Sequence, residues 1–166
     1  MSDLTLRVPA QRVDAPEQGD MIVEARSFRL RDAQGKTRAV LGVDDKGAPF
    51  LTMFDARGNS RAALHLVGED GQPRLALSDA QGSPQVVLCL GEDDGRPCLA
   101  LSDAGNTPRA LLHLGEYGPP GIALLDADGN MRAGLHLDMQ GQPRIIMRDA
   151  RGRTMYRAPE RLPKAE

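Results

Sequence analysis

Three histidines and one cysteine recur at a single position of a repeated pattern, ten residues after an Asp-Ala pair. These residues are His65, Cys89, His113 and His136. Imidazole and thiolate are the usual ligands of zinc and copper, so the row is a candidate metal site. In an antiparallel meander, however, these positions lie about 9.6 Å apart, too far for ligands to converge on one ion. We therefore interpret them as mid-sized strand residues and predict neither metal nor cofactor, although a threefold axis could bring three copies of one histidine together.

The only two cysteines, Cys89 and Cys98, lie nine residues apart across one turn. If Cys89 lies opposite Leu99 and Cys98 opposite Leu90, their side chains leave opposite faces of the sheet and cannot form a disulfide. We therefore expect two buried free thiols. Two cysteines are also too few for a disulfide scaffold or a four-ligand zinc site.

Charged residues recur as well. Asp126 and Asp128 resemble the start of a calcium loop, but no glutamate closes that loop, so we interpret them as turn residues. An arginine follows the Asp of the Asp-Ala pair by six residues in four units: Arg38, Arg61, Arg109 and Arg132. Exposed ion pairs contribute about 0–1 kcal/mol each, so we interpret the arginines as controlling solubility and register. A groove for an acidic ligand is the alternative.

Catalytic motifs are missing from the 166 residues. The sequence contains no Gly-x-Ser-x-Gly elbow, P-loop, dinucleotide fingerprint or His-Glu-x-x-His pair. The acidic residues that could act as acid and base already have positions in turns. The sequence therefore predicts that the protein is not an enzyme.

The chemistry-bearing residues all belong to a repeat of 23–24 residues. An Asp begins one turn of each unit, and Gly or Asn follows three residues later, as expected for a type I turn that ends in a positive φ. The turn residues are Asp32, Asp55, Asp79, Asp103, Asp126 and Asp149, with Gly35, Gly58, Gly82, Asn106, Gly129 and Gly152. A second turn alternates with the first and has Gly followed two residues later by Pro. Turns therefore account for many of the 18 glycines.

Between turns, apolar residues alternate with a period of two, which is typical of β-strands. The sequence predicts an all-β protein, a repeated β-hairpin meander of about eleven strands with a weakened last strand over residues 153–157. A two-sheet β-solenoid is the main alternative, and a propeller or barrel is a further one. We expect a repeat domain over residues 21–158 and flexible tails over residues 1–20 and 159–166.

The expected pairing also predicts which faces are apolar. With Leu77 opposite Gln85 and Leu88 opposite Ala100, the leucine pairs of successive strands point to opposite faces. Such a ribbon is apolar on both sides and must be covered. We expect homo-oligomerisation, with a trimer preferred, because an aromatic content of only 3% suits a narrow core of regular leucine layers.

Charge and hydropathy exclude several partners. The chain has 21 Lys+Arg and 23 Asp+Glu, and a net charge of −2 predicts no nucleic-acid partner. No apolar run is long enough for membrane insertion or an export signal, so we expect neither a membrane span nor a signal peptide. We expect a cytoplasmic protein, with export by a non-classical route as the alternative, and the tails could bind a larger assembly partner.

The unit that starts at Phe28, Phe-Arg-Leu-Arg-Asp-Ala-Gln-Gly-Lys-Thr-Arg-Ala-Val-Leu, resembles uncharacterised bacterial β-hairpin-repeat proteins. These are built from Phe-x-Leu-x-Asp-x-x-Gly-x-x-Arg-Ala-x-Leu units, and the resemblance spans Ile22 to about Pro159. It implies no activity, and it places glycine, as at Gly42, where this chain has its histidines. The predicted function is structural: an oligomeric β-repeat rod, spike or scaffold of self-assembling fibre type. The alternative is a binding module for a metal or small anionic ligand.

Overall fold

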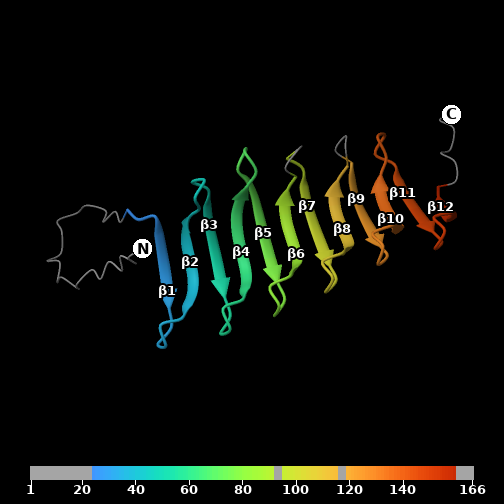
Figure 1. Ribbon diagram of the computed structural model, residues 1–166. Helices are drawn as coiled ribbons and strands as arrows, with labels where there is room; N and C mark the ends of the chain where they lie inside the picture. The colour runs from blue at the N-terminus through green and yellow to red at the C-terminus, as the bar shows by residue number, and fades with distance from the viewer. Residues whose placement is uncertain (1–23, 92–94, 116–118, 160–166) are drawn as a thin grey trace.

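The computed structural model describes residues 24–91, 95–115 and 119–159. Within these ranges twelve antiparallel strands form one sheet in chain order, and Figure 1 shows them side by side in a single layer. The strands are β1 (Ser27–Arg31), β2 (Thr37–Val43), β3 (Pro49–Phe54), β4 (Ser60–Val67), β5 (Gln72–Ser78), β6 (Pro84–Leu90), β7 (Pro97–Ser102), β8 (Pro108–Leu114), β9 (Pro120–Leu125), β10 (Met131–Leu137), β11 (Pro143–Arg148) and β12 (Thr154–Ala158). The hairpin meander is confirmed, and the solenoid is not adopted. The predicted tails lie almost entirely outside the described residues.

The Asp-Ala turns close in one repeated way. In the turn between β7 and β8, the Asp103 N–H donates to the Thr107 carbonyl at 2.9 Å, and the Asn106 N–H donates to the Asp103 carbonyl at 2.8 Å. Asn106 has φ 62°, a left-handed conformation that asparagine tolerates better than most residues. The other described Asp-Ala turns have glycine with positive φ at this position. The turn chemistry read from the sequence therefore matches the backbone geometry.

Each described Asp-Ala hairpin also contains a β-bulge beside the turn. In the β7–β8 hairpin, Leu101 pairs with Ala110 and Ser102 pairs with Pro108, so Arg109 is an extra residue. The equivalent extra residues of the described hairpins are Arg38, Arg61, Gln85, Arg109, Arg132 and Met155. The recurring arginine is thus the bulge residue in four units. A bulge places two residues opposite one and shifts the register beyond it by one.

The bulge makes the predicted facing of the leucines wrong. Leu77 pairs with Val86 rather than with Gln85, because Gln85 is the bulge residue of the β5–β6 hairpin. A one-residue shift moves every side chain of a strand to the other face of the sheet. The leucine pairs of β5 and β6 therefore lie on the same face.

The second kind of turn differs from the prediction by one residue as well. Leu88 pairs with Leu99 rather than with Ala100. The reason is the β6–β7 turn, in which the Gly91 N–H donates to the Arg96 carbonyl at 2.8 Å. With both corrections, the leucine pairs of successive strands share one face, and the prediction of two equally apolar faces is wrong.

We call this side of the sheet the leucine face. Its central row comprises Phe28, Leu41, Leu51, Leu64, Leu75, Leu88, Leu99, Leu112, Ile122, Leu135 and Ile145. The opposite face has a row of mostly small residues behind it: Val40, Thr52, Ala63, Ala76, Val87, Ala100, Leu111, Ala123, Gly134 and Ile146. Side-chain size therefore distinguishes the two faces.

Candidate functional site

The leucine face lacks a second layer among the described residues. Leu88 is 50% exposed and Leu135 is 48% exposed, although each has apolar neighbours on both adjoining strands. Apart from Met139 and Met155, the exposed large apolar side chains of the described chain all belong to this face. Contiguous apolar patches of this extent mark interaction surfaces in soluble proteins.

The rows that flank the central row alternate between large and smaller side chains. On one side Leu77 lies between Ala62 and Val86, and on the other side Leu66 lies between Pro49 and Pro73 in the order of the strands. The pattern follows from the sequence. Two residues before the central row, β2, β4, β6, β8 and β10 have Ala or Val, whereas β3, β5, β7, β9 and β11 have Pro. Alternation of this kind gives the face projections and notches that a second apolar surface can fill.

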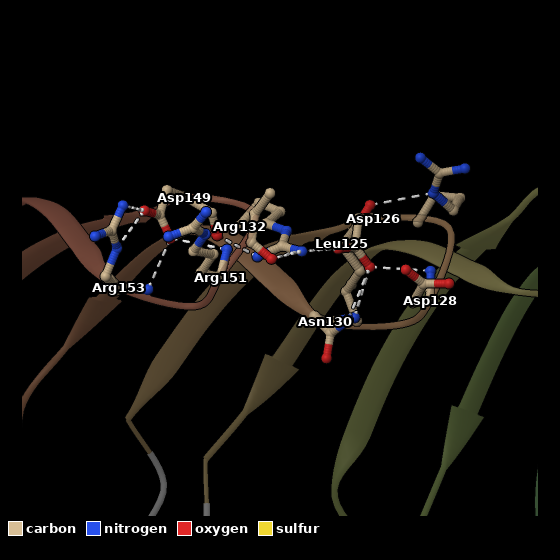
Figure 2. A network of polar contacts seen from close by, with 10 residues as sticks. Leu125, Asp126, Asp128, Asn130, Arg132, Asp149, Arg151 and Arg153 are labelled. Atoms are coloured by element: carbon tan, nitrogen blue, oxygen red, sulfur yellow. Dashed lines mark hydrogen bonds and ion pairs between the residues drawn. The ribbon is translucent and has the colours of Figure 1, made fainter.

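A network of charged side chains connects the Asp-Ala turns, which lie side by side at one end of the strands. Figure 2 shows Arg132 between two turns: it pairs with Asp126 of its own turn and donates hydrogen bonds to the Asp149 carbonyl and, at 3.1 Å, to the Ala150 carbonyl of the next turn. Arg109 likewise pairs with its turn aspartate and donates to the Leu125 carbonyl at 3.1 Å. These arginines are thus engaged within the chain, which does not favour a groove for an acidic ligand.

At the opposite end of the strands, the turn between β10 and β11 contains the same type of aspartate–arginine ion pair. The spacing of the Asp-Ala pairs does not predict it. Asp138 and Arg144 are also six residues apart, and their side chains pair at 2.7 Å. The Asp138 carboxylate accepts the Gln140 and Gln142 N–H groups as well. The spacing of six residues, if applied to every aspartate, could have predicted this pair.

Hydrogen bonds stabilise the charged form of the turn carboxylates. The pKa of Asp103 is lowered, first by the Thr107 N–H and then by the hydrogen bond from Arg109. The pKa of the equivalent or related turn carboxyls is lowered as well at Asp32, Asp44, Asp55, Asp126, Asp138 and Asp149. Each carboxylate therefore holds the turn more strongly when ionised.

Stability should fall in acid because of these turns. A carboxyl with a lowered pKa in the folded state contributes stability above its ordinary pKa of 3.8, and that contribution is lost as the pH falls through the folded-state value. The urea midpoint is therefore expected to be lower at about pH 3 than at about pH 7. Asp103→Asn, which removes one titrating group, should reduce this difference. Equal midpoints for the unmodified protein at the two pH values would contradict the prediction.

The histidine and cysteine row lies on the face opposite the leucines. It runs across the sheet through residues paired directly with one another, and we call it the polar row. Its members are Phe50, His65, Arg74, Cys89, Cys98, His113, Gly121, His136 and Arg144. The four residues predicted from the sequence occupy β4, β6, β8 and β10. The intervening members do not follow from the spacing of the sequence, because the expected register differs from the observed one by one residue.

Neighbours in the polar row separate the histidines from one another. His65 lies between Phe50, on which its ring stacks with centroids 5.8 Å apart, and Arg74. His113 and His136 lie on either side of Gly121. Across the described part of the chain, no three His, Cys, Asp or Glu side chains gather closely enough to hold a metal ion.

The two cysteines lie directly opposite each other on adjacent strands, contrary to the prediction. Cys89 on β6 lies directly opposite Cys98 on β7, so the expected partners Leu99 and Leu90 are wrong. Both side chains are on the same face, and the two sulfur atoms are 3.6 Å apart. Both thiols are half-buried and free. The conclusion that these side chains leave opposite faces is therefore corrected.

No protein family and no curated protein matches the sequence. The described residues include no helix of the length and apolarity that crossing a membrane requires. The leucine face and the polar row are consequently interpreted from their own geometry.

Proposed function

We propose that this protein is a structural assembly module, whose leucine face packs against the same face of further copies to form an oligomeric β-scaffold. The observation that carries this proposal is the confinement of the exposed large apolar side chains to one side of a single-layer sheet. A sheet is stable in water when its apolar face is covered by another layer. Within the described residues, the chain supplies no such layer.

The size of the leucine face supports a self-associating surface. Twelve strands at about 4.8 Å spacing and six residues at about 3.4 Å rise give a face of about 50 by 20 Å, or about 1,000 Å². Stable protein interfaces bury about 800 Å² per partner. One leucine face against another is therefore large enough for a stable association without any further contact.

The repeat also supports a partner with the same periodicity. Large and small side chains alternate from strand to strand in the flanking rows, as at Leu77 and Val86, so a second copy presents projections and notches at the same spacing. Three copies around one axis form a narrow prism in which the central leucine rows converge. We propose this trimer as the arrangement, because leucine, unlike a large aromatic residue, fits three times into such an axis.

Charges at the two ends of the sheet favour association through faces rather than through edges. The outer strand β1 carries Arg29 and Arg31, and the outer strand β12 carries Arg157. Like charges on edge strands oppose continued strand pairing between copies. The proposed assembly is thus a short rod or spike of defined length.

Light scattering coupled to size-exclusion chromatography tests the proposal on the full chain. The expected mass is three times the 17.9 kDa of one chain. A dimer would contradict the threefold arrangement but not the covered leucine face. A monomer at all accessible concentrations would overturn the assembly function.

A further inference from the structure

Cys89 and Cys98 lie opposite each other on the face that the proposed assembly leaves uncovered. Directly opposite residues of antiparallel strands have Cα atoms about 4.5 or 5.5 Å apart, and a disulfide requires about 4.4–6.8 Å. The pairing of Cys89 with Cys98 therefore meets the backbone requirement in either case. The sulfur atoms are already 3.6 Å apart, so rotation of the side chains, without movement of the strands, brings them to bonding distance.

The neighbouring strands hold Cys89 and Cys98 opposite each other. Strands β6 and β7 are the two middle strands of the sheet, and each is held on its other side by β5 or β8. Cys89 also lies opposite Arg74, and Cys98 lies opposite His113. Neither cysteine can therefore slip along its strand without disturbing the pairing of the neighbouring strands.

Reagents can reach the pair in the proposed assembly. Both thiols are half-buried rather than enclosed. They lie on the face opposite the leucines, so covering the leucine face with another copy leaves them accessible. The strand pairing that brings the two thiols together lies within a single chain.

The environment of the pair affects the Cys98 thiol. Burial and the hydrogen bond with Cys89 raise the pKa of the Cys98 thiol, and the charge of Arg74 offsets this in part. A thiolate is the attacking species in disulfide exchange. Either cysteine of the pair can make the first attack, because the other then lies opposite it to close the internal bond.

We propose that Cys89 and Cys98 form a reversible cross-strand disulfide by exchange with a low-molecular-weight disulfide of the glutathione type. The thiolate of one cysteine attacks one sulfur of that molecule, the S–S bond breaks, and the departing thiolate takes up a proton. The thiolate of the other cysteine then attacks the protein sulfur of the mixed disulfide, and the second small thiolate leaves and takes up a proton. The protein loses two electrons and two protons, and the small disulfide gains them as two thiols.

Glutathione disulfide is the probe for the experiment, used on the full chain with mass spectrometry and thiol titration. The expected product has lost both thiols and the mass of two hydrogen atoms, contains a linked Cys89–Cys98 peptide, and returns to the starting mass with a reductant. Accumulation of a stable glutathione adduct, or of disulfide-linked chains in place of the internal bond, would overturn the proposal.

Two variants separate strand geometry from mere thiol reactivity. Cys98→Ser should stop at the mixed disulfide, with the mass of one glutathione added at Cys89. The double variant Cys98→Ser/Ala100→Cys keeps two cysteines but moves the second to a diagonal position, about 7–8 Å from Cys89. That separation exceeds the disulfide range, so this variant should accumulate adducts on both cysteines. An internal disulfide formed equally fast in the double variant would contradict the assigned geometry.

Discussion

Leu135→Asp is expected to dissociate the assembled protein. Leu135 lies in the central row of the leucine face, between Ile122 and Ile145 on the adjoining strands. If another copy covers it, the substitution removes about 1.5–3 kcal/mol of apolar burial per chain and places an unpaired carboxylate in the interface. The dissociation constant should rise at least about a hundredfold, since about 1.4 kcal/mol corresponds to a factor of ten. Light scattering over a dilution series measures this shift.

The next residue of the same strand provides the control. His136 is exposed in the single chain, as Leu135 is, but its side chain lies on the opposite face. His136→Asp introduces the same charge on β10 and should leave the oligomeric mass unchanged. If the two variants behave alike, the leucine face is not the surface of association. Circular dichroism of both variants establishes that the strands are retained.

Deletion of Arg109 is expected to have a larger effect on stability than any substitution at this position. Arg109 is the bulge residue of the β7–β8 hairpin, and without it the register beyond Leu101 shifts by one. Leu112 and Leu114 would then turn to the opposite face. Leu112 is 49% and Leu114 is 38% exposed in the single chain, so misplacing both costs about half of the value for full burial, about 1.5–3 kcal/mol in total. The shift also divides the sheet between β7 and β8. Urea denaturation should show a large fall in the midpoint or loss of a single transition.

Arg109→Ala separates the bulge from the ion pair. This variant keeps the number of residues and therefore the register, but it removes the ion pair with Asp103 and the hydrogen bond to the Leu125 carbonyl, each at 3.1 Å. The arginine side chain is 44% exposed, so each of these two contacts should contribute only about 1 kcal/mol or less. A deletion that is no more harmful than Arg109→Ala would show that the bulge does not set the register.

The repeated turns and strands could be predicted from the sequence because their causes are local. A period of two, a glycine or Asn106 at each described position of positive φ, and Asp at the start of each Asp-Ala turn favour a hairpin meander over a β-solenoid. The same local pattern led to the recurring arginine as a turn partner. It gave no sign that this arginine is an additional residue within the strand pair.

The faces of the sheet required the tertiary structure. Side chains of a strand alternate between the two faces, so a difference of one residue in register moves all of them to the other face. The bulge residue Gln85 causes one such difference, and the β6–β7 turn, with its hydrogen bond from Gly91, causes another. For this reason the register expected from the sequence divides the leucines between two faces and separates Cys89 from Cys98. Each error was a single residue, yet it decided which side chains meet.

The sequence by itself determined an all-β repeat with turns of known chemistry, because turn formation depends on residues within a few positions of one another. It favoured the hairpin meander but left a β-solenoid open, which the strand order of the sheet decided against. Only the tertiary structure decided that the leucines lie on one face and that the two cysteine sulfur atoms lie 3.6 Å apart on the other. Those features depend on the register between strands. Register is a property of the paired backbone that no single strand contains.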